Sequence, residues 1–297
     1  MSTLTAFWAP ALPVARIVWL RRLVYLFVLV DVLVFVTDPV PHGDVPSALY
    51  RPLLVRQVLH LPQPSHLYVR LLLAVLVLSA AVAATGRLPR VAGWTCALAM
   101  LDWMSNGMSY SKIDHDHFAF VLALFVLPTV RAARSSDHSL DQGAGWAIRL
   151  IQMGAVASYF LAFWAKMRFG GWGWASGATL VWALTRRPHG IAPWLGQQAL
   201  LTHAMQWTVL VLEACSPLML WLRGRPLYAY MLFWLCFHAS TYYLLAISFL
   251  PLVICLFAFL PLERLGTPAR QDITPARRRR SAAACPPAAA EAPWSAR

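Results

Sequence analysis

Long apolar stretches, separated by short polar loops, run through most of the chain. About eight of them approach or reach the roughly 20 residues that a helix needs to cross a bilayer. The last two form one apolar run, which we divide at Pro251 because proline lacks the amide hydrogen that a helix interior uses. The pattern predicts an all-α protein, a polytopic integral membrane helical bundle with about eight transmembrane helices. The stretches cover residues 18–36, 67–85, 91–108, 117–131, 147–167, 204–222, 226–246 and 248–262.

Two shorter stretches, 175–186 and 194–203, lie between the fifth and sixth long ones. They are too short to cross a bilayer and are flanked by tryptophan, which favours the headgroup level, so we predict interfacial helices. The last residues, 263–297, are rich in Ala, Pro and Arg and lack the apolar side chains that a core requires. The predicted organisation is a membrane domain over 1–262 and a disordered tail over 263–297.

Composition supports a membrane class and excludes others. Hydrophobic residues make up 59% of the chain and charged residues only 12%, with a mean hydropathy of +0.58. Soluble domains carry roughly twice that charged fraction. The formal net charge of +13 comes without a basic face interleaved with aromatics, so we expect no nucleic-acid partner. The five cysteines form no CxxC pair, which excludes a zinc site or disulfide framework of that kind.

Basic loops predict the orientation. Arg16 and Arg21 place the N-terminus in the cytoplasm, and eight spans return the arginine run 277–280 to the same side. We therefore expect a multi-pass protein of the cell membrane with both termini cytoplasmic. The polar loop 109–117 and the end of the fifth span, at Lys166, then reach the opposite face together and should lie close.

Lys166 is the most unusual residue of the fifth span. This span also carries Tyr159, and it runs directly into a Gly/Trp turn over 172–177. A lysine in hydrocarbon is costly unless it is paired, reaches the interface or loses its proton. One interpretation is a snorkelling side chain, and the other is a desolvated neutral amine that acts as a general base. The residues alone favour snorkelling.

The loop Asp114–His117 carries His115 and His117. A His-x-His pair can chelate a metal, but no third ligand is evident, and we predict no metal site. Histidine also suits proton transfer near neutral pH. Alternatively, the acidic side chains cap the helix that starts near His117. The sequence leaves these interpretations open.

Ionisable residues also occur inside other predicted spans. Glu213 and His238 lie in the sixth and seventh spans, where such groups usually face the bundle interior and pair. They indicate either a functional pocket or a structural pair, Glu213 with a neighbouring arginine. We interpret Asp31 and Asp102 as packing or counter-charge residues.

Four tryptophans surround the end of the fifth span. They form either an interfacial belt or an apolar wall for a flat lipidic ligand such as a quinone ring. They are Trp172, Trp174, Trp182 and Trp194.

The combination of these motifs resembles a known family. Tyr159, Lys166 and the segment 174–177 (Trp-Ala-Ser-Gly) are similar to the signature Y-x-x-x-G-x-x-K-L…W-x-x-G-x-A. This signature belongs to the HTTM (horizontally transferred transmembrane) domain family, related to vitamin K-dependent gamma-carboxylase. The loop 111–117 with its apolar run, and the part of the chain that holds Glu213 and His238, resemble further blocks of the family. The resemblance covers roughly residues 15–262, and Phe163 stands where the signature has glycine.

The resemblance implies a chemistry. In the carboxylase, the matching lysine deprotonates vitamin K hydroquinone, oxygen converts the quinol to an epoxide, and the strong base so formed removes a glutamate γ-proton before carbon dioxide adds. By this resemblance Lys166 is the base and His115 or His117 assists, in a pocket that excludes water. The implied cofactor is a reduced quinone. The other implied cofactor-binding residues are Tyr159, Trp174, His238 and Glu213.

Two functions remain open. Only the tail follows the last span, so we do not expect carboxylation of a propeptide-bearing protein. The first function is a quinol-dependent oxygenase or epoxidase-type enzyme, favoured by Lys166 and the histidine loop. The second is a non-catalytic membrane scaffold or a maturation partner of a small secreted peptide or protein, favoured by Phe163. The expected partners are the lipid bilayer, a quinone and such a peptide.

Overall fold

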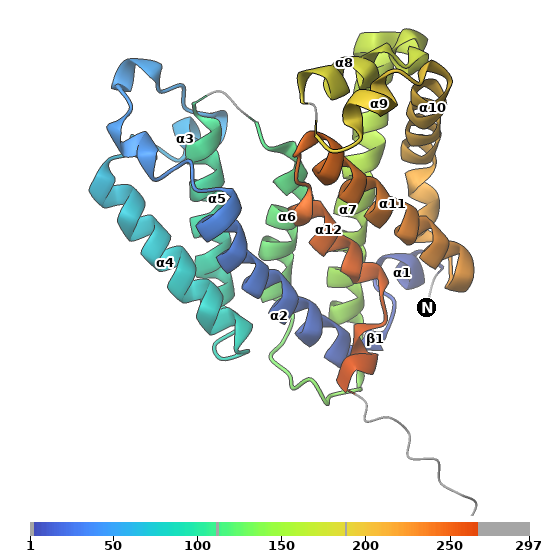
Figure 1. The fold of residues 1–297 in the computed structure, drawn as a ribbon. Coiled ribbons are helices and arrows are strands. Elements are labelled where there is room, and N and C mark those ends of the chain that lie inside the picture. The colour runs from blue at the N-terminus through green and yellow to red at the C-terminus, as the bar shows by residue number, and fades with distance from the viewer. Residues whose placement is uncertain (1–2, 111–112, 188, 267–297) are drawn as a thin grey trace, which may run out of the picture. The chain divides into compact units, whose positions relative to one another are not determined.

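The structure, a computed structural model, describes residues 3–110, 113–187 and 189–266. Within these ranges the fold is all-α, with twelve α-helices, short 3-10 or π turns and one pair of two-residue strands (Figure 1). The strands β1 (Leu12–Pro13) and β2 (Leu140–Asp141) pair antiparallel. The α-helices are α1 (Thr3–Trp8), α2 (Val14–Val30), α3 (Leu54–Val58), α4 (His66–Ala84), α5 (Val91–Met108), α6 (Phe118–Val126), α7 (Gln142–Gly170), α8 (Ala178–Arg186), α9 (Ala192–Gly196), α10 (Ala199–Cys215), α11 (Gly224–Leu245) and α12 (Leu250–Leu256). The shorter turns are η1 (Asp31–Phe35, π), η2 (Pro41–Asp44), η3 (Ser47–Leu49), η4 (His115–His117), η5 (Leu127–Thr129), η6 (Gly171–Ser176), η7 (Ser216–Leu220), η8 (Phe257–Phe259) and η9 (Leu262–Gly266).

The all-α prediction is confirmed, and a helix occupies each predicted long stretch. The division near Pro251 is also confirmed. Helix α11 ends at Leu245, the next residue Ala246 has a left-handed φ of 52°, and α12 begins at Leu250. Pro251 thus occupies the first turn of α12, where a missing amide hydrogen costs nothing.

The second predicted interfacial helix, 194–203, is wrong in its extent. Helix α9 ends at Gly196, and the chain turns through Gln198, whose φ of −95° and ψ of 80° are not helical. Residues 199–203 instead form the first turn of α10. The first predicted interfacial stretch corresponds to α8, preceded by η6.

The predicted tail begins too early at 263. Residues 263–266 belong to the folded unit, because the 3-10 turn η9 (Leu262–Gly266) packs on α2. The Arg16 side chain donates two hydrogen bonds of 2.7 Å to the Glu263 carboxylate. Although burial opposes its ionisation, the bonds from Arg16 hold the pKa of Glu263 below its usual value. The rest of the predicted tail, 267–297, lies outside the described residues.

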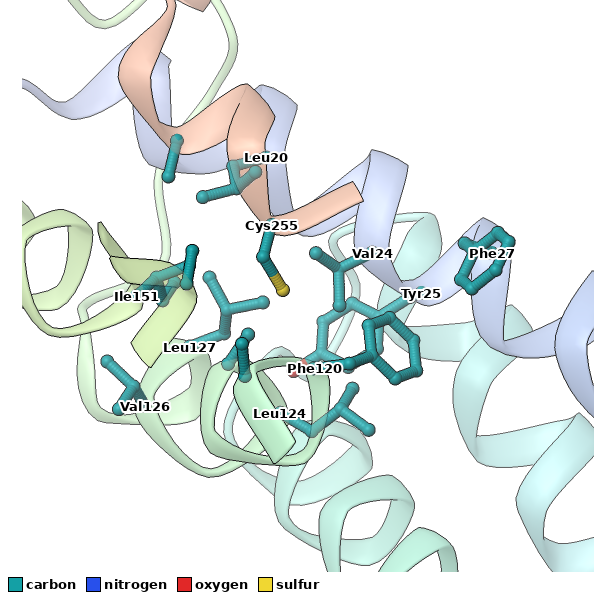
Figure 2. Packing of buried hydrophobic residues seen from close by; sticks show 14 of the residues in the cluster. Leu20, Val24, Tyr25, Phe27, Phe120, Leu124, Val126, Leu127, Ile151 and Cys255 are labelled. Atoms are coloured by element: carbon teal, nitrogen blue, oxygen red, sulfur yellow. The ribbon is translucent and has the colours of Figure 1, made fainter. Parts of the chain in front are cut away.

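The core forms where α2, α6, α7 and α12 meet. Figure 2 shows the Cys255 side chain of α12 among Leu20 and Val24 of α2 and Leu127, all of them buried. Ile151 of α7 belongs to the same cluster. Together these helices fix the positions of the segments that carry His117 and Tyr159.

Membrane-crossing capacity differs among the helices. In the described part of the chain, α4 and the helical segment Gln142–Ser176 are long and apolar enough to cross a membrane, judged by length and hydropathy. The segments His115–Thr129 and Leu250–Phe259 are apolar but shorter. The crossing of a membrane by the other helices stays a prediction.

Gly145 of α7 allows a close approach of the N-terminal segment. A Cβ atom at this position would lie 1.5 Å from the Pro10 carbonyl oxygen. We expect Gly145→Ala to destabilise the protein by about 1–3 kcal/mol, because overpacking outweighs the better helix propensity of alanine. Thermal unfolding of the purified protein measures this. The matched control is Gly173→Ala, where a Cβ would meet no atom within 4 Å. Equal thermal unfolding midpoints for the two variants would contradict the close packing of Gly145 against Pro10.

Candidate functional site

A cavity of about 990 Å³ lies among α5, α6, α7, α11 and α12, and we call it the main cavity. Its walls are largely apolar, with side chains such as Met104, Leu122, Ala162 and Phe237. The volume matches that of pockets for flat organic ligands. Six of the seven sequence-predicted site residues line it. They are Lys166, His115, His117, Tyr159, Glu213 and His238.

Lys166 is paired, rather than snorkelling or isolated. Its Nζ donates to both carboxylate oxygens of Glu213, at 2.5 and 2.6 Å. The side chains are 21% and 5% exposed, respectively, so the pair is largely shielded from solvent. The Trp174 ring lies 4.9 Å from Nζ, a cation–π contact, but Trp174 does not line the main cavity. Glu213 thus pairs with Lys166, and the expectation of an arginine partner was wrong.

Tyr159 and His238 form a second polar pair. The Tyr159 hydroxyl lies 2.8 Å from Nε2 of His238, and both side chains are buried. The Tyr159 ring stacks on Trp234, with centroids 3.8 Å apart. The Nδ1 atom of His238 has no hydrogen-bond partner among the described residues. This atom is therefore available to a ligand in the cavity.

Trp234 was not singled out from the sequence. It is fully buried and fixes the Tyr159 ring. The available signal was its position one helical turn before His238 in the same apolar span.

The two histidines lie in the 3-10 turn that leads into α6. His117 is buried, and its Nε2 lies 3.0 Å from Oδ2 of Asp31. The counter-charge interpretation of Asp31 is thereby confirmed. His115 is exposed, and its ring centroid lies 6.5 Å from that of Phe249.

Asp116 belongs to the same turn and lies on the other side of the His117 ring. Its Oδ1 is 3.5 Å from Nδ1 of His117. Although burial opposes ionisation, the interaction with His117 lowers the pKa of Asp116. No side-chain capping bond is present at the start of α6 in the described residues, so the capping interpretation was wrong.

Two further candidates lie outside the site. Phe163, which stands where the signature has glycine, does not line the main cavity, and its ring lies 5.9 Å from that of Phe160. Asp102 forms an ion pair with Arg56 and accepts a hydrogen bond from Tyr68. Asp102 thus has the counter-charge role predicted for it.

The lining of the main cavity combines polar groups with apolar walls. Within residues 3–110, 113–187 and 189–266, no three His, Cys, Asp or Glu side chains are grouped to hold a metal. The polar groups are the Lys166–Glu213 pair and Nδ1 of His238, which has no partner among the described residues. The apolar walls are typical of pockets for small organic ligands.

Comparisons with protein-family models, curated proteins and solved structures find no match for this chain. The fold and the site therefore define the class of protein by themselves. It is an all-α protein with a large apolar cavity that is lined by a partly buried lysine–glutamate pair, a tyrosine–histidine pair and the histidine turn His115–His117.

Proposed function

We propose that the chain is a multi-span membrane protein whose main cavity binds a reduced quinone, with Lys166 as the base of a quinol-dependent oxygenase or epoxidase-type reaction. The main cavity is the observation that carries this proposal. It joins Lys166 of α7 to the histidine turn before α6, two segments that are far apart in the sequence. The HTTM resemblance assigns a common role to the same two segments.

The outer surface of α4 supports the membrane assignment. Its large apolar side chains lie three or four residues apart, so they form one face of the helix, and that face is solvent-exposed. These residues are Leu67, Leu71, Val75, Leu78 and Val82. The buried face carries small residues such as Ala80 and Ala83, which is typical of helix packing in lipid. A soluble monomer rarely exposes such a continuous apolar face. A cell-membrane location with cytoplasmic termini belongs to the same proposal and rests on the basic loops.

An arginine on this face tests the assignment. Val75→Arg, at the middle of α4, is expected to cost about 2.5–3.5 kcal/mol of membrane insertion, because it places a cation in the centre of the bilayer. A membrane-insertion reporter carrying α4 measures the inserted fraction. Thr85→Arg, at the exposed end of the helix, is the control and is expected to insert normally. Normal insertion of Val75→Arg would contradict a lipid-facing α4.

The Lys166–Glu213 pair supplies the proposed base. In the proposed reaction the Glu213 carboxylate takes a proton from the Lys166 ammonium across their hydrogen bond, and the resulting neutral amine faces the main cavity. That amine then accepts a proton from a bound hydroxyl group. A reduced quinone supplies the phenolic proton and the electrons that oxygen accepts.

The remaining polar groups position the ligand and move protons. The Tyr159 hydroxyl donates a hydrogen bond to Nε2 of His238, which leaves the Nδ1 hydrogen to bond a ring oxygen of the ligand. Asp31 orients the His117 ring through its contact with Nε2. In the proposed reaction His117 carries a proton on the other ring nitrogen, Nδ1. His115 is the alternative assisting residue, since it lines the same cavity and is more exposed.

Photolabelling tests ligand binding in the main cavity. A photoreactive quinone with a short isoprenoid chain should crosslink to the lining segments of α6, α7 and α11, and an excess of unlabelled quinone should remove these crosslinks. Mass spectrometry of the digested protein locates them. Ala162→Trp, which fills the cavity from α7, should abolish labelling, whereas Ala178→Trp on exposed α8 should not. Labelling that is unchanged both by an excess of unlabelled quinone and by Ala162→Trp would overturn the proposal.

A second function has one observation in its favour. The Lys166 ammonium is already neutralised by Glu213 and covered by the Trp174 ring, which also suits a purely structural ion pair. In this case the chain is a non-catalytic scaffold or a maturation partner of a small secreted peptide. Quinone binding without any turnover, or no quinone binding at all, would favour it.

A further inference from the structure

A second cavity of about 310 Å³ lies against the histidine turn. It shares the segment 113–117 and Phe249 with the main cavity, so these residues form a wall common to both. The rest of its lining comes from the segment 31–38, from Arg187 and from the chain between α11 and α12. None of the interpretations above assigns it a role.

One buried acceptor in this cavity lacks a partner. The Asp31 side chain is 0% exposed, and its Oδ2 is bonded to His117. Its Oδ1 has no hydrogen-bond partner among the described residues, although Asp31 lines the second cavity. A buried carboxylate oxygen without a donor is costly, so its presence indicates a donor that the described residues do not supply.

The charge of the lining agrees with a cationic donor. Four carboxylates line the second cavity, against one arginine and two histidines. The formal charge therefore stays negative even with both histidines protonated. The carboxylates are Asp31, Asp38, Asp114 and Asp116, and the basic groups are Arg187, His115 and His117.

We propose that the second cavity binds a primary ammonium group carried on a short aliphatic stem. The Oδ1 atom of Asp31 offers a single acceptor, because Oδ2 is taken by His117. This matches a compact ammonium, whereas the planar guanidinium fork is best matched by two free oxygens. A metal ion is disfavoured because the described side chains form no group of three ligands for one. Phe35, Val36 and Ile247 supply apolar contacts for the stem.

The bound ammonium would lie across the histidine turn from the main cavity. The occupants of the two cavities would then contact opposite sides of the same wall, which contains His115 and His117. Such an ammonium belongs either to a free alkylamine or to a peptide, through its N-terminus or a lysine side chain. Competition by each source distinguishes them.

Titration of the full chain in detergent tests the proposal without quinol or oxygen, so its outcome is independent of the proposed function. The probe is n-butylammonium, followed by ligand-observed NMR, with n-butanol and n-butylguanidinium as comparisons. We expect n-butylammonium to bind, n-butanol not to bind, and the guanidinium to bind several-fold more weakly. A lysine-containing peptide or a free amine that displaces the probe then identifies the source. Equal binding of butanol and butylammonium would overturn the proposal.

Three variants locate the site. Asp31→Asn should weaken n-butylammonium binding at least about tenfold, because it removes the charge of the buried acceptor. Asp38→Asn, at an exposed position, should weaken it a few-fold without affecting folding. Asp44 lies outside the second cavity and pairs with His66, so Asp44→Asn is the matched control. This variant should bind n-butylammonium as the wild type does. Unchanged affinity in both folded Asp31→Asn and Asp38→Asn would contradict the assignment.

The chain's own Lys112 precedes the shared wall in the sequence and provides a further check. We expect Lys112→Met to bind the probe as the wild type does. If the probe bound only to Lys112→Met, the proposal would be overturned, because the carboxylates would then pair with Lys112 in the wild-type protein.

Discussion

Lys166→Met is expected to lower the rate of quinol oxidation by about 10²–10⁴-fold, the usual contribution of a positioned general base. Methionine keeps the length and apolar stem of the side chain while the amine is lost, and it leaves the Glu213 carboxylate without its partner. Binding of the quinone should change much less than the rate, because the apolar walls supply most of the contact.

A matched substitution separates this effect from a general loss of positive charge at the end of α7. Arg168→Met removes an exposed cation two residues further along, which does not line the main cavity. Its rate should equal that of the wild type. Mass spectrometry of the quinone after incubation with oxygen measures both variants. A rate in Lys166→Met that equals the wild-type rate would exclude Lys166 as the base.

Glu213→Leu is expected to lower the free energy of unfolding by about 2–3 kcal/mol. Breaking a fully buried ion pair typically costs about 3–5 kcal/mol, because the remaining charge has no partner. The cost is smaller here, because the Lys166 side chain is 21% exposed and its ammonium retains the Trp174 contact.

The double variant Lys166→Met/Glu213→Leu should recover most of this loss. Replacing both charges by apolar side chains of similar size leaves no unpaired group in the protein interior, so its stability should lie within about 1 kcal/mol of the wild type. Unfolding in mixed detergent micelles measures the wild type, both single variants and the double variant. Equal destabilisation in Glu213→Leu and in the double variant would contradict the pairing.

Local sequence patterns were sufficient to place the long helices, but not the short helices α1 and α3. Apolar runs mark each long helix because helix length and hydropathy are properties of contiguous residues. The division before Pro251 could be predicted for the same reason, since proline acts on its own turn. The end of α9 was missed because a single glycine and a non-helical Gln198 interrupt an otherwise continuous apolar pattern.

The pairs in the candidate site were harder to predict. Lys166, Glu213, Asp31 and His238 were recognised as unusual because each is ionisable within an apolar span. Their partners were not, because Lys166 and Glu213 are 47 residues apart and Asp31 and His117 are 86 apart. Such contacts depend on how helices pack, which periodicity alone does not determine. The predicted topology placed the histidine loop and Lys166 on the same face of the membrane, and both line the main cavity.

The most direct test of the central claim uses isotopically labelled oxygen. The full chain, in lipid nanodiscs, is supplied with a reduced quinone and ¹⁸O₂, and the quinone is analysed by mass spectrometry. We expect one ¹⁸O atom in an epoxidised quinone product for the wild type and for Arg168→Met, and loss of that product in Lys166→Met. Absence of labelled product across a panel of benzoquinols and naphthoquinols, from a protein that binds them, would contradict a quinol-dependent oxygenase.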